Sequence, residues 1–249
     1  MTIRRMCRRH RPTPRHCAHN TDCMIEELTK RAQELGVAVR GAFHPDPEEL
    51  WPQLSSTPIG TIVLLGFTGG TQWPVFARSA EASDGQPNPL DRWSRRVIGA
   101  LSREWGGRDF YPNDVPFPPF QQFAKRCEPV YASPIGLLIH AHWGLWHAYR
   151  GGLLFGERMN LSEPQVSRSP CDSCQTRPCL NACPVGAFAS GSFDFKACMS
   201  HVSSATGSDC RELGCRARRA CPVATPFSYP PQQARFHMNA FIGSKLIED

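Results

Sequence analysis

Apolar residues recur at helical spacing in two long segments of the chain. The first spans residues 24–35 and is stopped by Gly36. The second spans residues 89–105, where an aromatic or aliphatic side chain returns at every fourth position. Such stripes predict helices that bury one face in a core. Proline pairs precede two shorter helices, which we expect over residues 120–126 and 232–242.

Other segments have the apolar patterns of β-strands. Val37 and Val39 alternate with small residues, and residues 61–67 form the continuous run typical of a buried strand. The glycines that follow lack the Gly-Lys-Ser/Thr ending of a phosphate-binding loop, so we interpret them as a turn. Residues 133–155 contain two β-rich runs around a turn near Trp143-Gly144. This pattern predicts a hairpin or strand pair.

The mixture of helices and strands predicts an α+β domain over residues 24–165. A stretch with proline and serine, residues 162–170, separates it from a cysteine-rich segment that we place at 166–230. Residues 231–249 then form a C-terminal helix and tail. The length of 249 residues leaves room for one or two compact units of this kind.

Most of the net charge lies at the beginning of the chain. The formal charge is +6, and residues 1–23 hold six arginines and one acid, so the remainder is nearly neutral. These residues show no helical or strand period before the amphipathic pattern opens at Met24. We expect a disordered basic arm or an extension upstream of a true start at Met24. A basic tether and a zinc site with Cys7, Cys17 and Cys23 are the alternatives, although the spacings match no zinc finger.

The cellular compartment follows from what the sequence lacks. The longest apolar run, Ile62 to Leu65, is too short for a membrane helix. The first residues contain no apolar stretch of the kind found in secretion signals. We therefore expect a cytoplasmic protein, in which clustered cysteines serve metal or redox chemistry rather than disulfide bonds.

Eight of the 12 cysteines fall within residues 171–221. The first four form C-x2-C-x4-C-x3-C-P, and the second four are more widely spaced and also end in Cys-Pro. In two-cluster ferredoxins, the cysteine before proline ligates the other cluster. The pattern predicts two 4Fe-4S clusters that exchange one ligand. The expected metal ligands are Cys171, Cys174, Cys179 and Cys221 for one cluster, and Cys183, Cys198, Cys210 and Cys215 for the other.

Two zinc sites are the alternative, because zinc also binds four cysteines on short loops. Zinc accounts for the first C-x2-C but not for the two Cys-Pro endings. Four arginines lie between or beside the last ligands. Their positive charge would favour the reduced form of a cluster or bind an acidic partner protein. A solvated basic loop is equally compatible. The arginines are Arg211, Arg216, Arg218 and Arg219.

An α+β domain followed by a two-cluster module resembles the corrinoid iron-sulfur reductases, which include epoxyqueuosine reductase and the reductive dehalogenases. The segment SPIGLLIHAHWGLWHAYRGGLLF looks like the strand pair before the clusters in epoxyqueuosine reductase, and IHAHWGLWHAYRG is similar to part of a cobalamin-processing chaperone. The resemblance covers about residues 55–225. It implies a nitroreductase-like sheet-and-helix domain and a small ferredoxin-like module with two 4Fe-4S clusters. It also implies a corrinoid or flavin ring beside His140, Trp143, Gly144, Trp146, Tyr149 and Arg150.

The chain departs from the epoxyqueuosine reductase pattern in several respects. The acid expected to protonate the substrate has no clear counterpart, since only Asp114 is near that place. We find no C-terminal helical repeats of the kind that assist transfer RNA binding. The x4 spacing between Cys174 and Cys179 also differs, and resembles the cluster loops of glutamate synthase and dihydropyrimidine dehydrogenase. Epoxyqueuosine is therefore not the substrate that we expect.

Three histidines near the middle of the chain need their own interpretation. His140, His142 and His147 could chelate a metal or bind cobalt. If the segment is a strand, alternation places His140 and His142 on one face. Histidines satisfied by ordinary hydrogen bonds are the favoured alternative.

These observations predict an iron-sulfur oxidoreductase that relays electrons to a cofactor or substrate in its N-terminal domain, with cobalamin as a candidate cofactor. One alternative is a ferredoxin-like electron carrier with no catalytic site of its own. A weaker one is a zinc-stabilised module that binds nucleic acid through its arginines. The expected partners are a redox protein that donates electrons and a small-molecule substrate, and neither nucleic acid nor membrane.

Overall fold

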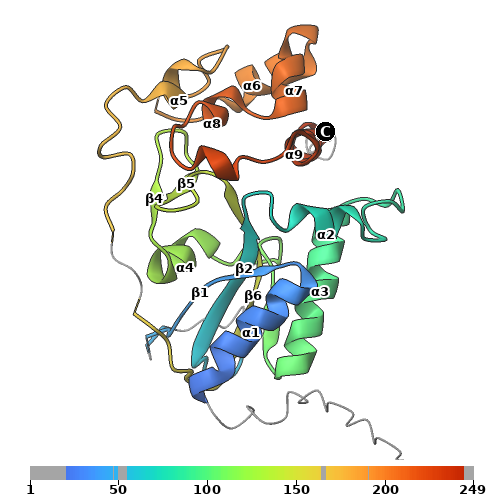
Figure 1. The fold of residues 1–249 in the computed structure, drawn as a ribbon, viewed down its shortest axis with the longest axis vertical. Coiled ribbons are helices and arrows are strands. Elements are labelled where there is room, and N and C mark those ends of the chain that lie inside the picture. The colour runs from blue at the N-terminus through green and yellow to red at the C-terminus, as the bar shows by residue number, and fades with distance from the viewer. Residues whose placement is uncertain (1–20, 47, 50–54, 164–166, 190, 244–249) are drawn as a thin grey trace, which may run out of the picture.

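The computed structural model describes residues 21–46, 48–49, 55–163, 167–189 and 191–243. A sheet with helices forms the lower part of the molecule, and short helices form the upper part (Figure 1). The lower elements are α1 (Thr21–Leu35), β1 (Ala38–Phe43), β2 (Thr61–Thr68), α2 (Trp73–Ala77), α3 (Pro89–Trp105), β3 (Arg108–Phe110), α4 (Phe120–Cys127), β4 (Val130–Ala132), β5 (Leu138–His140) and β6 (His147–Phe155). The upper elements are α5 (Pro178–Asn181), α6 (Phe195–Ser203), α7 (Ser208–Leu213), α8 (Arg216–Arg219) and α9 (Pro231–Gly243), with single turns of 3-10 helix at Ala205–Gly207 and Thr225–Phe227.

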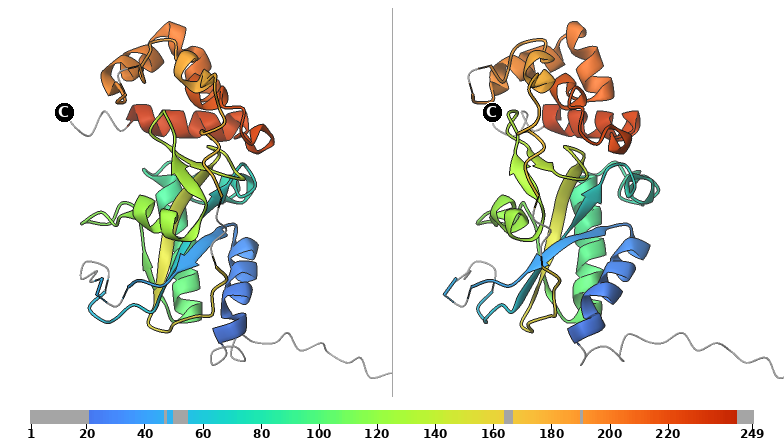
Figure 2. Two further views of the ribbon diagram at one scale, coloured as in Figure 1. Left: turned by 90° about the vertical axis from the view of Figure 1, so that its left-hand side faces the viewer. Right: turned by 60° about the vertical axis from the view of Figure 1, so that its left-hand side comes forward.

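Strands β1, β2, β6 and β3 form an antiparallel sheet in that order. Helices α1 and α3 cover one face, and α4 covers the other (Figure 2). Every residue of β2 is buried, because the strand lies between two neighbours and beneath helices on both faces. This position explains why its sequence is a continuous apolar run rather than an alternating one.

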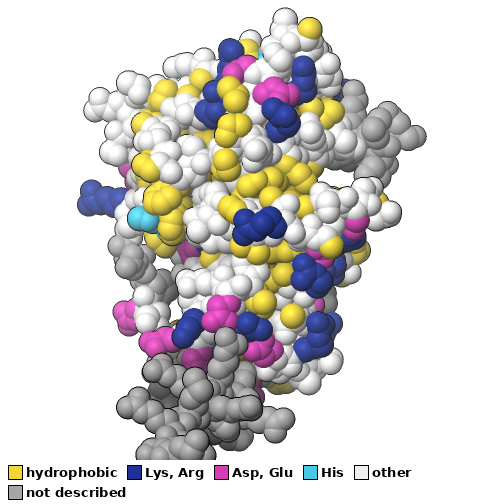
Figure 3. All heavy atoms as spheres, turned by 45° about the vertical axis from the view of Figure 1, so that its right-hand side comes forward, with side chains coloured by type: hydrophobic (Ala, Val, Ile, Leu, Met, Phe, Trp, Pro, Cys, Tyr) yellow, Lys and Arg dark blue, Asp and Glu magenta, His cyan; other side chains and the backbone are white. Residues whose placement is uncertain are grey.

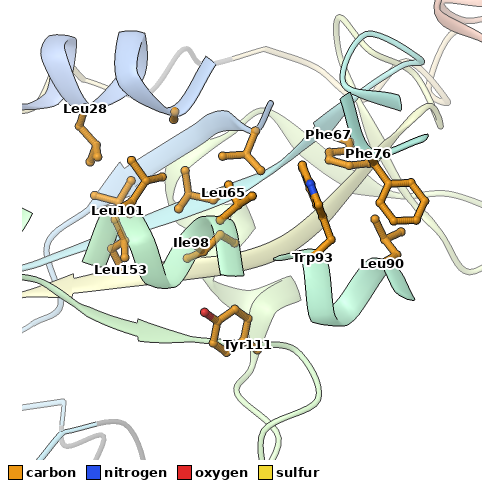
Figure 4. Packing of buried hydrophobic residues seen from close by; sticks show 14 of the residues in the cluster. Leu28, Leu65, Phe67, Phe76, Leu90, Trp93, Ile98, Leu101, Tyr111 and Leu153 are labelled. Carbon is orange, nitrogen blue, oxygen red and sulfur yellow. The ribbon is translucent and has the colours of Figure 1, made fainter. Parts of the chain in front are cut away.

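The larger core lies between the sheet and the helices α1 and α3. Trp93 of α3 lies against Phe67 of β2 and Phe76 of α2, with ring centroids 5.7 and 5.8 Å apart (Figure 4). Leu101 is fully buried two turns further along α3, in the same cluster as Leu28 of α1. The apolar side chains that recur at every fourth position of α3 therefore pack in this core.

The helices predicted from apolar spacing are confirmed, with α3 beginning and ending where expected and α1 beginning three residues before Met24. The prediction of a hairpin over residues 133–155 is wrong. Strand β5 pairs with β4, whereas β6 inserts between β2 and β3. Both runs do form strands, but each has a partner from elsewhere in the chain.

Both neighbours of β2 contain a β-bulge. The register of β1 against β2 skips Arg40, and the register of β6 against β2 skips Arg150. A bulge inserts an unpaired residue and changes the direction of its side chain. Gly66 permits the second bulge, because a Cβ atom there would lie 2.0 Å from the carbonyl oxygen of Ala148. The two bulged arginines both take part in the site described below.

The upper helices pack on the β4–β5 pair through a small core of their own. It joins Ile135 and Ile139 to cysteines and to Ala217 of α8. Gly144 has a φ of 57°, and a Cβ atom there would lie 2.5 Å from the carbonyl oxygen of Val223. Only glycine permits this approach between the segment before β6 and the end of the cysteine-rich segment.

Helix α9 connects the upper and lower parts. It packs along α7, and its Phe236 ring lies 5.2 Å from that of Trp73 in α2. Hydrophobic side chains gather across the middle of the face in Figure 3, between the upper helices and the sheet. The upper and lower parts of the molecule, for which the sequence predicts separate domains, therefore share an apolar contact through α9.

The sequence predicts an arm at the beginning of the chain and no helix that crosses a membrane. The predicted arm, residues 1–23, lies outside the described residues except for its last three, which belong to α1. Among the helices that the structure describes, none is long and apolar enough to cross a membrane.

Candidate functional site

One group of four thiols, which we call the proximal quartet, surrounds a small cavity. Cys171, Cys174, Cys179 and Cys221 all line it. Burial raises the pKa of Cys171, and the neighbouring thiols of Cys221, Cys179 and Cys174 raise it further. The cysteine before proline at the end of the segment thus lies with three cysteines from its beginning.

The other four thiols form a distal quartet. Burial raises the pKa of Cys198 to about 11, and the proximity of Cys215, Cys183 and Cys210 adds to the rise. Burial likewise raises the pKa of Cys215, with Cys210 and Cys183 again contributing. The structure therefore brings the eight cysteines together in the two sets that the sequence analysis assigned to two clusters.

Backbone amides point at several of these sulfurs. The N–H of Ala187 donates to Sγ of Cys183 at 3.3 Å. Amide hydrogen bonds also oppose the rise in the pKa of Cys179 and Cys215. Such amides stabilise thiolate and the inorganic sulfide of a cluster. The donor set of four soft thiolates with aimed amides fits an iron-sulfur cluster.

The cysteines that the structure describes carry free thiols. Cys127 stands apart from the quartets, and burial raises the pKa of its thiol. Among the described residues, no group of three or more histidine, cysteine or acidic side chains is close enough to hold one metal ion.

Beside the proximal quartet lies a second, larger hollow, which we call the main cavity. Its volume is about 390 Å3. Strand β6 supplies one wall, and loops and α9 supply the others. The lining residues are Gln121, Gly136, Leu137, Leu138, Leu145, His147, Ala148, Tyr149, Arg150, Arg218, Tyr229 and His237.

Leu145 separates the main cavity from the proximal quartet. It lines both the main cavity and the small cavity among the cysteines. Its side chain is only 3% exposed, so it fills the space between them. Leu145 is therefore a wall residue that the main cavity and the small cavity among the cysteines have in common.

A buried polar network supports the wall formed by β6. Arg40 donates from Nε to the Glu128 carboxylate at 2.9 Å and from Nη1 to the carbonyl oxygen of Phe67 at 2.6 Å. Tyr149 donates its hydroxyl proton to the other oxygen of Glu128 at 2.5 Å. Burial raises the pKa of Glu128, against the opposing effects of Arg40 and Tyr149. Burial also raises the pKa of Tyr149, so its hydroxyl keeps the proton.

His140 and His142 do not share one face of a strand, because the strand that contains His140 ends there. His140 ends β5, whereas His142 lies in the following turn, and its ring contacts Trp143 and Phe227. Nδ1 of His140 accepts the backbone N–H of His142 at 2.9 Å. Burial, with Arg40 and His142 nearby, lowers the pKa of His140 to about 4. The short turn that separates β5 from β6 breaks the alternation.

His147 faces the main cavity from the start of β6. Its Nε2 donates to the carbonyl oxygen of Leu138 at 3.0 Å, which leaves Nδ1 as a buried acceptor with no partner in the described part of the chain. Burial lowers the pKa of His147 to about 3. The imidazole is therefore neutral at physiological pH.

Two of the six residues predicted beside a cofactor ring, Tyr149 and Arg150, line the main cavity. The other four do not line it: Gly144 and His140 form an isolated bridge, Trp143 contacts Phe227, and Trp146 packs on Tyr229, which is a lining residue. Among the arginines beside the last ligands, Arg218 lines the cavity, whereas Arg216 and Arg219 both pair with Asp209.

Asp114, the acid nearest to the place of a substrate acid in epoxyqueuosine reductase, does not line the main cavity. Its carboxylate accepts from Arg95 at 2.6 Å and from the backbone N–H of Tyr111 at 2.8 Å. Sequence reasoning also missed Arg40, Glu128 and the α9 residue His237. No local pattern marks them, because their contacts join distant parts of the chain.

No known protein family matches the sequence, and no curated protein matches it. Its fold does match solved structures. A selenomethionine-labelled epoxyqueuosine reductase has a TM-score of 0.51 at 14% identity, covering 87% of this chain and 69% of that protein. The epoxyqueuosine reductase of Bacillus subtilis has a TM-score of 0.52 at 15% identity, covering 86% of this chain and 70% of its own.

A third epoxyqueuosine reductase, solved with an epoxyqueuosine-modified tRNA stem loop, has a TM-score of 0.50 at 16% identity and covers 86% of this chain and 71% of its own. At these identities the likeness establishes a shared fold. The resemblance to epoxyqueuosine reductase noted in the sequence therefore holds for the architecture, a mixed α/β arrangement with a small antiparallel sheet.

Proposed function

We propose that this protein is an iron-sulfur oxidoreductase whose substrate or organic cofactor binds in the main cavity. The proximal quartet would hold one 4Fe-4S cluster and the distal quartet the other. When bound, such clusters supply the transfer of single electrons. A redox protein would be the electron donor, and a small molecule the substrate.

The observation that carries this proposal is the position of Leu145. It is the shared wall between the proximal quartet and the main cavity. A ligand in the main cavity would contact a residue that also lines the cavity of the four thiols, and electron transfer requires such a short separation. A protein that only carried electrons would have no need of a lined cavity at this place, so the oxidoreductase is favoured over the electron carrier.

The residues of the cavity favour a ligand with a flat apolar body. Leu137, Leu138 and Leu145 supply apolar surface, and Tyr149 presents an aromatic ring whose hydroxyl is held by Glu128. Apolar lining with a few fixed polar groups is typical of cofactor sites. A corrinoid or a flavin is the cofactor that we propose, by analogy with the reductases that share the fold.

Epoxyqueuosine is not the substrate that we propose. The acid nearest to the required place, Asp114, is engaged by Arg95 and by the backbone of Tyr111. The proton-bearing groups that line the main cavity include Tyr149, Tyr229, His147 and His237 instead. The reaction in this pocket therefore uses other residues for any proton that it transfers.

The proposal is tested first by metal analysis. Protein purified without oxygen should be brown, contain about eight iron atoms with matching acid-labile sulfide, and give paramagnetic resonance signals when reduced. Stoichiometric zinc without iron would overturn both the oxidoreductase and the electron carrier. Iron bound by a protein whose spectrum changes with neither hydroxocobalamin nor flavin mononucleotide would favour the carrier.

A further inference from the structure

The main cavity meets a second one at α9. The second cavity has a volume of about 480 Å3 and lies between α9 and the beginning of α3. Arg150 and His237 line both cavities. The two spaces thus adjoin at a pair of polar side chains, next to the apolar surface that would receive the body of a ligand.

Arg218 is a fixed cation on the wall of the main cavity. Its Nε and Nη2 atoms donate to the carbonyl oxygen of Leu145, with Nε at 3.1 Å. Its guanidinium lies over the rings of Trp146 and Tyr229, at 4.7 and 4.4 Å from their centroids. These contacts hold the guanidinium in one orientation before any ligand binds.

The charge of Arg218 is not neutralised by a carboxylate in the described part of the chain. Its neighbours Arg216 and Arg219 both form ion pairs with Asp209. Arg150 pairs with Asp91, which is 42% exposed. Among these four arginines, Arg218 alone faces a cavity without an acidic partner, and a guanidinium placed in this way favours an oxyanion bound beside it.

His237 supplies an independent sign of a missing partner. Its Nε2 atom is buried and has no hydrogen-bond partner among the described residues. Burial, together with Arg218 and Arg150 nearby, lowers the pKa of His237 to about 4, so the ring is neutral. An unpaired buried nitrogen is destabilising, and a ligand that bonds to it would relieve that cost.

We propose that Arg218, with His237 and Arg150, binds an oxyanion, a phosphate or carboxylate group of the ligand whose apolar body fills the main cavity. This inference rests on the proposed function and defines the class of its ligand as anionic. A guanidinium edge and a ring N–H match the geometry of an oxyanion, which accepts several hydrogen bonds at once. The nearby pair of Arg150 and Asp91 would position the guanidinium of Arg150 at the junction.

The test compares ligands that differ only in the anion, on full-length protein prepared without oxygen. Flavin mononucleotide and riboflavin differ by a phosphate, as do cobinamide phosphate and cobinamide. In at least one pair, we expect the phosphorylated member to bind about ten-fold more tightly, equivalent to about 1.4 kcal/mol. Inorganic phosphate should compete with that member, and competition by acetate at equal ionic strength would identify the carboxylate as a second source of the anion.

Two variants and one control identify the side chains that produce the preference for the phosphorylated ligand. Arg218→Gln should remove the preference, because it should weaken the binding of the phosphorylated member much more than that of the neutral member. His237→Phe, which keeps an aromatic ring where Tyr229 and Phe236 pack, should reduce the preference even if Arg218→Gln does not fold. Arg216→Gln removes the same charge from the same helix but lies outside the cavity, and should keep the full preference.

Equal binding of both members of each pair, or binding of neither pair, would overturn the oxyanion site. Iron content is measured on the same samples. About eight irons without any anion preference would refute this inference alone, whereas an anion preference in protein without iron would refute the proposed function and leave the oxyanion site standing.

Discussion

The ion pair of Arg40 and Glu128 decides where the aromatic wall of the main cavity stands. Both side chains are almost fully buried, with exposed fractions of 1% and 4%. Glu128 accepts from Arg40 and from Tyr149, so the carboxylate fixes the tyrosine that lines the cavity. No pattern in the sequence could indicate this pair, because 88 positions separate its members. The two sets of cysteines, by contrast, could be predicted from their spacing and their two Cys-Pro endings.

Replacing Glu128 with glutamine should destabilise the protein strongly. The variant leaves the Arg40 charge buried without its counter-charge, which costs about 3–5 kcal/mol. Urea unfolding of protein prepared without oxygen would measure the loss. Glu104→Gln is the control, because Glu104 pairs with Arg31 at the surface and its loss should cost less than about 1 kcal/mol. Similar effects of the two substitutions would contradict the assigned importance of the buried pair.

His147 should make the folded state sensitive to acid. At pH 7 its ring is neutral in both the folded and the unfolded chain. Below pH 6.5 the unfolded chain takes up a proton, whereas the folded chain does not until about pH 3, so the free energy of unfolding falls as the pH drops. Between pH 7 and pH 5 the wild type should lose about 2 kcal/mol more than His147→Phe. Parallel pH profiles for the two proteins would refute this.

At the scale of elements, the β-bulges and one glycine position the site. Periodicity alone predicted the helices α1 and α3, because each buries an apolar stripe within one segment, and the proline pair at its start predicted α9. It could not give the strand partners, since β6 inserts between β2 and β3 rather than pairing with β5. The bulges at Arg40 and Arg150 were equally hidden, because register depends on the neighbouring strand.

Gly144 is where the upper helices meet the segment before β6, and its replacement should show how much that contact matters. Gly144→Ala adds a Cβ atom 2.5 Å from the carbonyl oxygen of Val223, in a left-handed conformation. Gly136→Ala is the matched control, with a φ of 78° and open space around the new atom. The control should lose about 1–2 kcal/mol of stability from its backbone conformation alone. Gly144→Ala should lose more free energy of unfolding than this control, as measured in urea. Equal losses in the two variants would show that the contact with Val223 adapts to the added atom at no cost in stability.

At the scale of the whole molecule, the two ends of the cysteine-rich segment meet in the proximal quartet. Cys221 returns to the beginning of the segment to complete the proximal quartet, while Cys183 leaves for the distal one. Helix α8 lies between Cys215 and Cys221, so it joins the two quartets and also presents Arg218 to the main cavity. This interlocking is what makes the two proposed clusters and the cavity one functional unit.

The exchange of ligands between clusters is the central claim, and iron counting in two double variants tests it most directly. If the quartets each hold a cluster, Cys179→Ala with Cys221→Ala should keep about four irons, because both losses fall in the proximal quartet. Cys179→Ala with Cys183→Ala should keep none, because each quartet loses a ligand. The reverse result, with about four irons in the second variant and none in the first, would show that the clusters follow one another along the chain and contradict this account.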